Sequence, residues 1–276
     1  MNPLRLPHAL MLVLTGMASS VSASTEDFAH LQVRIEGHGV RTVVLAAGLG
    51  DTLDVWNTIQ PLIATHCTRT LAYTRAGYPG SEPAIGTRDA ATIVAELRSE
   101  LKRRGVAPPY VLVGHSLGGL YMQYFARQYP GEIQGLLLVD STHWNQQLQL
   151  SLQVEHADDR FRTVLFLPWI VRRELIDSEA AGQQVHESPH AGNVPTIVLA
   201  RARALIGETA ESRALEARLQ GDIAADFPAA RYLRIDDSGH YIQRDHPDAV
   251  VAAARELAGC APLVAKAEHR VRQVAR

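Results

Sequence analysis

The sequence feature that most constrains the fold is a serine turn, flanked by glycines, that follows a short apolar run. Residues 110–113 have the length and composition of a buried strand, and they lead directly into Gly114-His115-Ser116-Leu117-Gly118. The pattern of residues 117–129 favours a helix. A serine between a strand and a helix occupies a sharp, strained turn, and the flanking glycines let the two elements approach closely. The Ser116 hydroxyl is then expected to project above the sheet.

Further short apolar runs predict the rest of that sheet. Each is rich in Val, Ile or Leu, and they cover residues 42–46, 70–73, 136–139 and 196–200. A helical pattern follows Thr87 and ends at Gly105, and another covers residues 246–258. Strands that alternate with helices form βαβ units, and strands with continuous apolar runs are buried on both faces. We therefore expect an α/β fold whose central sheet is mostly parallel, with helices on both faces and an edge strand near residues 31–35.

Composition excludes several classes of protein. The chain has 276 residues, of which 46% are hydrophobic and 20% charged, so it can form a sizeable core as one domain. Its formal net charge of -2 gives no basic surface for nucleic acid. Two cysteines exclude a zinc or iron–sulfur site with four cysteine ligands.

The N-terminal residues 1–23 have the order of a secretory signal peptide. Arg5 precedes an apolar stretch over residues 9–18, and small residues lead to a cleavage position after Ala23. The apolar stretch is about half the length needed to span a bilayer, so no stable membrane anchor is expected. The sequence predicts a secreted or periplasmic protein whose mature part is residues 24–276.

Two segments fall outside the strand–helix alternation. More than fifty residues separate the runs that end at Val139 and begin at Thr196, which is too long for an ordinary connection. We interpret residues 141–192 as a small helical lid over the carboxyl edge of the sheet, with Trp144 closest to that edge. A purely structural insertion is the alternative. The basic tail, residues 261–276, is expected to be a solvated chain end.

The serine turn resembles that of the α/β-hydrolase superfamily. Four more segments look like those of exported bacterial α/β hydrolases, namely residues 46–51, 72–78, 138–143 and 238–243. Members of that group often have aspartate where this chain has Thr74. The resemblance implies an α/β-hydrolase fold, with the lid inserted after the sixth strand, and a nucleophilic Ser116.

A serine hydroxyl needs a base, and twelve histidines compete for that role. In the superfamily the base follows the last strand, and here the strand pattern of residues 231–236 leads to His240 in a Ser-Gly-His loop. We therefore take His240 as the base. His115 is interpreted as a packing residue, and His246 as the cap of the helix that begins near Pro247.

The resemblance also implies two backbone donors for the negative oxygen of the reaction. The N–H of Leu117 follows the nucleophile, and the second donor comes from the loop after residues 42–46. Leu49 is the expected second donor, and Gly50 is the alternative. A glycine turn that serves only to reverse the chain is the structural alternative for this loop.

The acidic partner of the base has two candidates. The superfamily usually places it a few residues beyond the strand at residues 196–200, where only Glu208 is available. Some members take it instead from the end of the preceding strand, which offers Asp140. We predict Asp140, with Glu208 or a missing acid as alternatives.

Cys67 and Cys260 are either bridged or two buried thiols. Export to an oxidising compartment favours a bridge. The resemblance places both cysteines after helices that cover the same face of the sheet, so we expect a Cys67–Cys260 disulfide.

Together these features predict a serine hydrolase that cleaves a small carboxylic ester through an acyl-enzyme, with Ser116, His240 and Asp140 as catalytic residues. An amidase, lactonase, thioesterase or perhydrolase with the same residues is the alternative, and a non-catalytic binding protein is a more distant one. This acyl-transfer chemistry requires no metal or organic cofactor. His186 and His190 have the spacing of a zinc-binding pair, but Pro189 between them argues against the helix that would align them. Nothing in the sequence indicates an oligomeric state.

Overall fold

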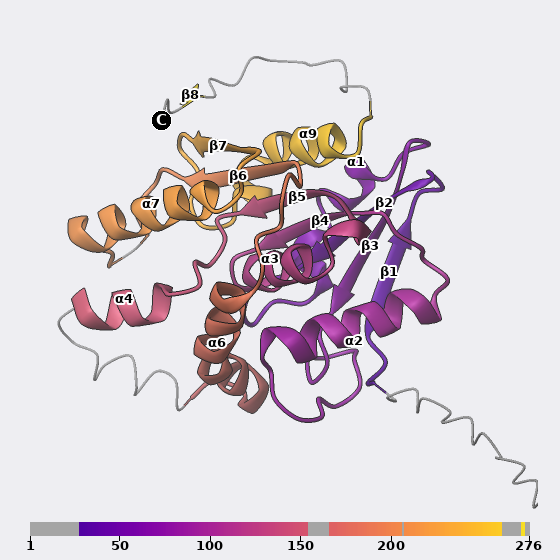
Figure 1. The fold of residues 1–276 in the computed structure, drawn as a ribbon, viewed down its shortest axis with the longest axis horizontal. Helices are drawn as coiled ribbons and strands as arrows, with labels where there is room; N and C mark the ends of the chain where they lie inside the picture. The colour runs from indigo at the N-terminus through magenta and orange to yellow at the C-terminus, as the bar shows by residue number, and fades with distance from the viewer. Residues whose placement is uncertain (1–27, 154–165, 206, 261–271, 274–276) are drawn as a thin grey trace, which may run out of the picture.

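The computed structural model describes residues 28–153, 166–205, 207–260 and 272–273. In this part of the chain, eight strands form one sheet in the order β1-β3-β2-β4-β5-β6-β7-β8 (Figure 1). The strands β2 to β7 run parallel, and β1 and β8 are antiparallel at the two edges. The strands are β1 (Gln32–Glu36), β2 (Arg41–Ala46), β3 (Thr68–Thr74), β4 (Tyr110–His115), β5 (Ile133–Val139), β6 (Thr196–Arg201), β7 (Ala230–Ile235) and β8 (Arg272–Gln273).

The apolar runs in the sequence correspond to the parallel strands, as predicted. Successive side chains of a strand point to opposite faces of the sheet, and here both faces are buried. In β2, Val43 and Leu45 contribute to one hydrophobic core, whereas Val44 and Ala46 contribute to the other. The two cores explain why these strands show continuous apolar runs. The alternating pattern of residues 31–35 lies mostly in β1, at the edge of the sheet.

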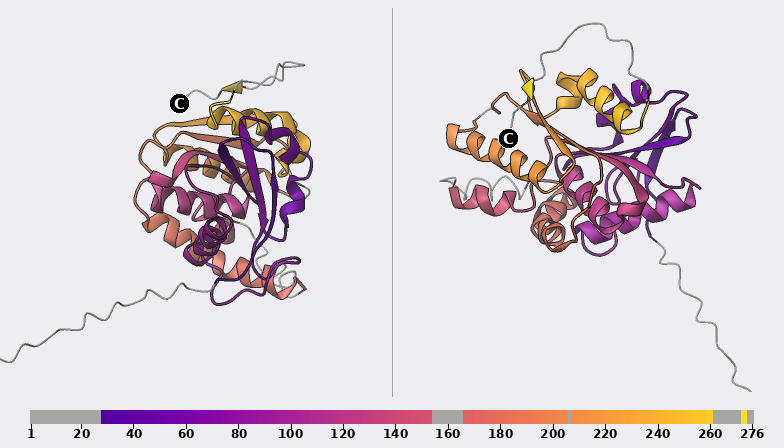
Figure 2. Two further views of the ribbon diagram at one scale, coloured as in Figure 1. Left: turned by 90° about the vertical axis from the view of Figure 1, so that its right-hand side faces the viewer. Right: turned by 45° about the horizontal axis from the view of Figure 1, so that its top comes forward.

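Helices cover both faces of the sheet (Figures 1 and 2). On one face lie the short helices η1 (Leu53–Trp56), α1 (Gln60–Ile63) and α8 (Ile242–Asp245) together with α9 (Pro247–Leu257). The other face carries α2 (Ala90–Arg103), α3 (Leu117–Gln128) and α7 (Ala210–Ala225). The short helix η2 (Pro130–Glu132) leads into β5.

The start of α2 differs from the prediction by two residues. Asp89, and not Thr87, is the N-cap, and its side chain accepts a hydrogen bond from the N–H of Thr92 at 2.9 Å. Thr87 instead donates to the Asp89 carboxylate at 2.8 Å. Thr87 thus supports the cap, because a carboxylate is a stronger acceptor for the first turn than a hydroxyl.

The segment between β5 and β6 contains two helices, α4 (Gln146–Gln153) and α6 (Trp169–Glu187). Five strands of the described chain precede it, one fewer than the expected six. The helix α6 packs against α2 and α3, and a methyl group on its Gly182 would collide with the carbonyl oxygen of Trp144. Part of the predicted lid, residues 154–165, lies outside the described residues.

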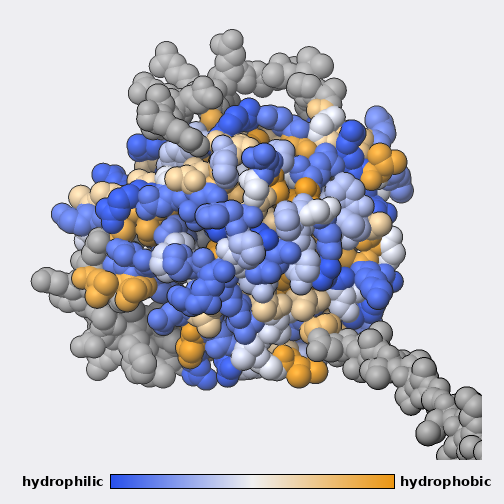
Figure 3. Space-filling view, in the orientation of Figure 1, coloured by the Kyte–Doolittle hydropathy of each residue, from blue (hydrophilic) through white to orange (hydrophobic). Residues whose placement is uncertain are grey.

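Among the described residues, half of the large apolar side chains that are exposed belong to the insertion. In Figure 3, apolar side chains gather at the position of α4, against a mainly hydrophilic surface. The exposed large apolar residues of this segment are Leu148, Leu152, Phe166, Trp169 and Ile176.

The predicted signal peptide, residues 1–23, lies outside the described residues, as does most of the tail at 261–276. Two residues of that tail, Arg272 and Gln273, pair with β7 at the edge of the sheet. Among the described helices, none has the length and apolar character required to cross a membrane.

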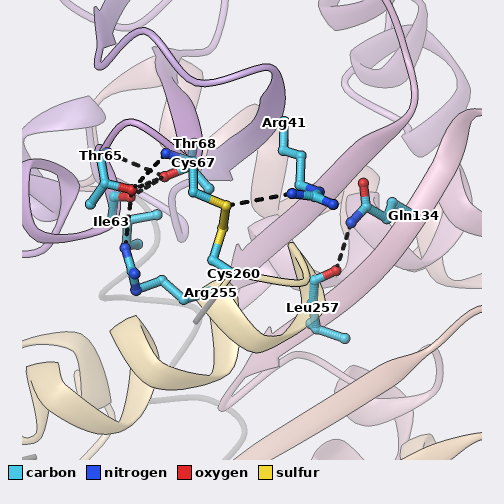
Figure 4. Close-up of a disulfide and its surroundings, with 9 residues drawn as sticks. All are labelled: Arg41, Ile63, Thr65, Cys67, Thr68, Gln134, Arg255, Leu257 and Cys260. Atoms are coloured by element: carbon cyan, nitrogen blue, oxygen red, sulfur yellow. Dashed lines mark hydrogen bonds between the residues drawn. A yellow bond between two sulfur atoms is a disulfide. The ribbon is translucent and has the colours of Figure 1, made fainter. Parts of the chain in front are cut away.

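The predicted disulfide joins Cys67 to Cys260, with the two Cα atoms 6.0 Å apart (Figure 4). Cys67 lies shortly after α1 and Cys260 shortly after α9, on the same face of the sheet. Nearby, Arg255 of α9 donates to the Thr65 hydroxyl at 3.1 Å. The bridge therefore fastens the last helix to the start of β3, on the face opposite α3.

Candidate active site

Ser116 occupies the turn between β4 and α3 with strained backbone angles, φ 52° and ψ −125°. A non-glycine residue rarely adopts a positive φ, so surrounding hydrogen bonds must hold it there. The Ser116 N–H donates to the carbonyl oxygen of Val139 at 3.1 Å. Its own carbonyl oxygen accepts from Gly119 at 2.9 Å and from Thr142 at 3.0 Å. These bonds fix the turn to the end of β5, and the serine remains partly accessible to solvent.

The glycines around Ser116 are required by close approach. A Cβ atom on Gly114 would lie 2.5 Å from the Cα of Gly119, and one on Gly118 would collide with the carbonyl oxygens at the end of β2. A Cβ atom on Gly48 would lie 3.2 Å from the Ser116 Cβ. The loop after β2 therefore lies directly beside the serine.

Asp140 and His240 meet at the carboxyl edge of the sheet. The Nδ1 atom of His240 lies 2.6 Å from Oδ2 of Asp140, and the Asp140 side chain is only 4% exposed. Asp140 is held at the end of β5, where its N–H donates to Leu199 at 2.8 Å. Like Ser116, it has a positive φ, 43°, which the sequence did not reveal. His240 comes from the loop after β7, so the expected base and acid are brought together.

The two candidate donors after β2 differ in their environment. The Gly50 N–H donates to the Tyr78 hydroxyl at 3.1 Å, so it is already engaged. Gly50 has a φ of +80°, which favours glycine at this turn. Leu49, the preceding residue, packs against the small apolar cluster formed by Tyr78, Ile170 and Val171.

The model of the alpha/beta hydrolase family matches residues 43–254, which include the serine turn, Asp140 and His240. The match covers most of the chain. The chain belongs to the alpha/beta hydrolase family. In this hydrolase Ser116 follows β4, Asp140 follows β5 and His240 follows β7.

The hydrolase is also similar in sequence to two proteins of Bacillus subtilis. It is 29% identical over 233 residues to the uncharacterized protein YqjL of Bacillus subtilis, covering 83% of this chain and 87% of that protein. It is 31% identical over 116 residues to the uncharacterized protein YbdG of the same organism. That second match covers 41% of this chain, and the hydrolase matches only 35% of the length of YbdG.

Solved structures show the same fold. A hydrolase from Pseudomonas aeruginosa PA01 superimposes with a TM-score of 0.61 at 22% identity, covering 86% of this chain and 97% of the other. A thermophilic esterase from Thermogutta terrifontis gives a TM-score of 0.59 at 18% identity, covering 85% and 94%. At these identities the likeness concerns the fold of the hydrolase alone.

Glu208, the alternative acid, binds Arg201 and not His240. The Arg201 guanidinium donates to both Glu208 oxygens, at 2.9 and 2.5 Å. Burial acts to raise the pKa of Glu208, but hydrogen bonds from the Arg201 side chain and the Leu205 N–H, together with the Arg201 charge, outweigh burial and lower that pKa. The same guanidinium has its Nε atom 3.4 Å from Asp140, so Arg201 stands between the two acids.

His115 is a packing residue, as expected, but it also supports the histidine loop. It is fully buried, and its Nε2 lies 3.0 Å from the carbonyl oxygen of His240. Burial, with a smaller effect of the His240 charge, lowers the pKa of His115 to about 3. It is therefore neutral at pH 7. Because a carbonyl oxygen only accepts, the ring proton is on Nε2.

A buried network beside the site was not found from the sequence. Arg75, just after β3, donates to the backbone of the Gly48 loop and to Glu174 of α6, and Tyr78 also binds Glu174. Arg75 and Tyr78 belong to residues 72–78, which resemble a segment of exported hydrolases. That resemblance was the only feature of the sequence that pointed to these two residues. Nothing in the sequence linked them to Glu174.

The remaining predicted positions have structural roles. Thr74 is buried, accepts from the Leu53 N–H at 3.1 Å and donates to Gln32 at 3.0 Å. His246 stands at the N-cap of α9, where it was expected. The His186 ring stacks on Trp144 with the ring centres 3.9 Å apart, which joins α6 to the segment after Asp140.

Proposed function

We propose that this hydrolase cleaves a carboxylic ester by acyl transfer, with Ser116 as nucleophile, His240 as base and Asp140 as acid. The observation that carries the proposal is the 2.6 Å contact between Asp140 and His240, at the same sheet edge as the strained serine. A plain turn serine would need neither a positive φ nor a buried acid–histidine pair nearby.

The proton path follows from the donors and acceptors. An ionised carboxylate only accepts, so Nδ1 of His240 carries the proton directed at Asp140, and Nε2 is the basic nitrogen. Nε2 takes the Ser116 proton as Oγ attacks the ester carbonyl carbon, and later returns it to the departing alcohol. Water, activated by the same nitrogen, then releases the acid from Ser116.

Backbone N–H groups of Leu117 and Leu49 would hold the oxygen that becomes negative during attack. Gly50 is the weaker candidate, because its N–H already donates to Tyr78. These donors, the serine, the base and the acid complete the acyl-transfer chemistry within the chain, so the proposal requires no metal and no organic cofactor.

An ester is favoured over other acyl compounds for two reasons. Two of the proteins that share the fold are esterases, from Thermogutta terrifontis and from a marine microorganism. In addition, the side chains beside Leu49 are apolar, namely Ile170 and Val171 from α6. An apolar surround suits an acyl or alcohol group without charge.

The test compares the purified mature chain with Ser116→Ala on 4-nitrophenyl acetate and butyrate. We expect release of nitrophenolate by the wild type and a fall of at least ~10³-fold in kcat for the variant. A fluorophosphonate probe should label the wild type and leave Ser116→Ala unlabelled. Equal rates and equal labelling in the two proteins would refute the proposal.

We also propose that the protein is exported and cleaved after Ala23. The Cys67–Cys260 disulfide supports this, because structural disulfides persist in oxidising compartments. N-terminal sequencing of the chain recovered from the periplasm or medium should begin at Ser24. Recovery in the cytosol with Met1 intact and both thiols reduced would contradict export.

A further inference from the structure

Arg75 is buried beneath the loop that follows β2, and all its contacts with that loop are to backbone carbonyl oxygens. Its side chain is 2% exposed. Nη1 donates to the carbonyl oxygen of Ala47 at 2.5 Å, and Nη2 donates to that of Gly48 at 2.7 Å. The guanidinium also forms a two-point ion pair with Glu174, whose Oε1 lies 2.6 Å from Nε and whose Oε2 lies 2.8 Å from Nη2.

We propose that Arg75 is a positioning residue that fixes the peptide between Gly48 and Leu49, so that the Leu49 N–H faces the reacting oxygen. The inference rests on the proposed esterase function and extends it to residues outside the catalytic trio. In a trans peptide the C=O and N–H point in opposite directions. A carbonyl oxygen held by Arg75 therefore turns the Leu49 N–H away from the guanidinium, toward the side of the loop that Ser116 borders.

The positive charge adds a second effect. A cation at the carbonyl oxygen draws electron density from the amide, and this polarisation strengthens the N–H of the same peptide as a donor. In a buried site the effect is larger than in water. Arg75 thus acts on the oxyanion through one peptide unit and does not touch the substrate.

Tyr78 fixes the next peptide of the loop. Its hydroxyl donates to Glu174 at 2.6 Å and accepts from the Gly50 N–H at 3.1 Å. The peptides on both sides of Leu49 are therefore held by one buried network. An oxyanion donor that is fixed before the substrate binds costs no reorganisation during the reaction.

Through Glu174, the inserted helix α6 belongs to the buried network that holds the loop after β2. Glu174 is fully buried, and Val171 of the same helix lies beside Gly50. If α6 moved away, it would leave the Arg75 charge buried without its counter-charge, which is strongly unfavourable. The first half of α6 is therefore a fixed wall of the site and not a lid that opens.

The experiment removes both charges together, because a single substitution would leave a buried ion unpaired. In Arg75→Met/Glu174→Met the ion pair is replaced by apolar side chains of similar length, a change that folded proteins tolerate. The matched control is Arg88→Met/Glu96→Met. That pair is also buried, and the Arg88 guanidinium donates to both Glu96 carboxylate oxygens, at 2.6 and 2.9 Å. Arg88 lies just before α2 and Glu96 lies in it, and neither residue is hydrogen-bonded to the loop after β2.

Each protein is assayed with 4-nitrophenyl butyrate and with 4-nitrophenyl thionobutyrate, in which sulfur replaces the carbonyl oxygen. A developing sulfur anion accepts hydrogen bonds weakly, so the oxygen-to-sulfur rate ratio measures the oxyanion donors. For Arg75→Met/Glu174→Met we expect kcat for the oxygen ester to fall ~10²-fold, KM to change less than ~3-fold, and the ratio to fall at least ~10-fold. The control should match the wild type in kcat and in the ratio.

Arg75→Lys serves as the second variant, since it keeps the charge for Glu174 but cannot reach both carbonyl oxygens at once. It should fold and show a smaller fall in kcat together with a lower ratio. If Arg75→Lys and the double variant both have the kcat and the oxygen-to-sulfur rate ratio of the wild type, while Ser116→Ala is inactive, the positioning role is overturned. Activity in Ser116→Ala would instead refute the proposed function itself.

Discussion

Asp140 and His240 form a 2.6 Å hydrogen bond across a separation of 100 residues. The second carboxylate oxygen of Asp140 accepts the Arg201 N–H at 3.2 Å, so both oxygens are occupied. A carboxylate fixed in this way can orient the imidazole ring and select its tautomer. Asp140 and Glu208 both lie beyond the end of a parallel strand. Of these two carboxylates, Asp140 contacts His240, whereas Glu208 contacts Arg201.

Asp140→Asn should lower kcat by about 10³- to 10⁴-fold with little change in stability. The amide fills the same space, but its NH₂ group can turn toward Nδ1 and stabilise the wrong tautomer of His240. The assay is steady-state hydrolysis of 4-nitrophenyl butyrate at pH 7.5. Glu208→Gln is the control and should retain kcat within about 3-fold, because Glu208 contacts Arg201. A crippled Glu208→Gln beside an active Asp140→Asn would reverse the assignment.

The disulfide should contribute to stability and not to catalysis. A bridge that closes a loop with a sequence separation of 193 restricts the unfolded chain strongly. The chain-entropy estimate is up to ~5 kcal/mol in the free energy of unfolding. Urea unfolding of Cys67→Ser/Cys260→Ser should give a lower midpoint than the wild type, with kcat unchanged at 25 °C.

Reduced wild type provides the control for that experiment. The chain has two cysteines, so a reductant changes this bond alone and should reproduce the urea midpoint of the double variant. An unchanged midpoint in both proteins would show that the bridge adds nothing to stability.

The strands were predictable because a strand that is buried on both faces needs apolar residues at consecutive positions. The runs at β2 to β6 are continuous and apolar, and the serine turn with its glycines marks the end of β4. The start of α2 was misplaced because Thr87 and Asp89 are both good capping residues. Local sequence does not say which one the helix uses.

The site was predictable only where a local motif marks it. Ser116 lies in such a motif, and His240 follows the last strand in a recognisable loop. The role of Arg75 depends on Glu174, which is 99 residues further along the chain, and on backbone carbonyl groups that have no sequence signature. The choice between Asp140 and Glu208 likewise required the position of Arg201, which only the fold determines.

His115 should make the protein less stable as the pH falls. Its pKa is about 3 in the folded protein, because it is buried, against 6.5 for an exposed histidine. Between these values the unfolded chain binds the proton and the folded protein does not, so stability is present above pH 6.5 and is lost toward pH 3. From pH 6.5 to 5 this single group should lower the free energy of unfolding by about 1.5 kcal/mol.

The measurement is urea unfolding at pH 6.5, 6.0, 5.5 and 5.0 for the wild type and His115→Gln. Glutamine can still donate to the His240 carbonyl oxygen but does not titrate. The variant should show a flatter dependence on pH, and the difference between the two proteins removes the contribution of other groups, including the buried His143. Parallel pH profiles would mean that His115 titrates normally when folded.

Two helical glycines should respond oppositely to alanine. A methyl group on Gly182 in α6 would collide with the Trp144 carbonyl oxygen, whereas one on Gly221 in α7 meets nothing within 4 Å. Gly182→Ala should therefore lower the free energy of unfolding by about 1–3 kcal/mol, since backbone must shift. Gly221→Ala should raise it by about 0.5–1 kcal/mol, because alanine favours the helix. Both are measured by urea unfolding, and a Gly182→Ala variant as stable as Gly221→Ala would contradict the close packing of α6 on the segment that carries Trp144.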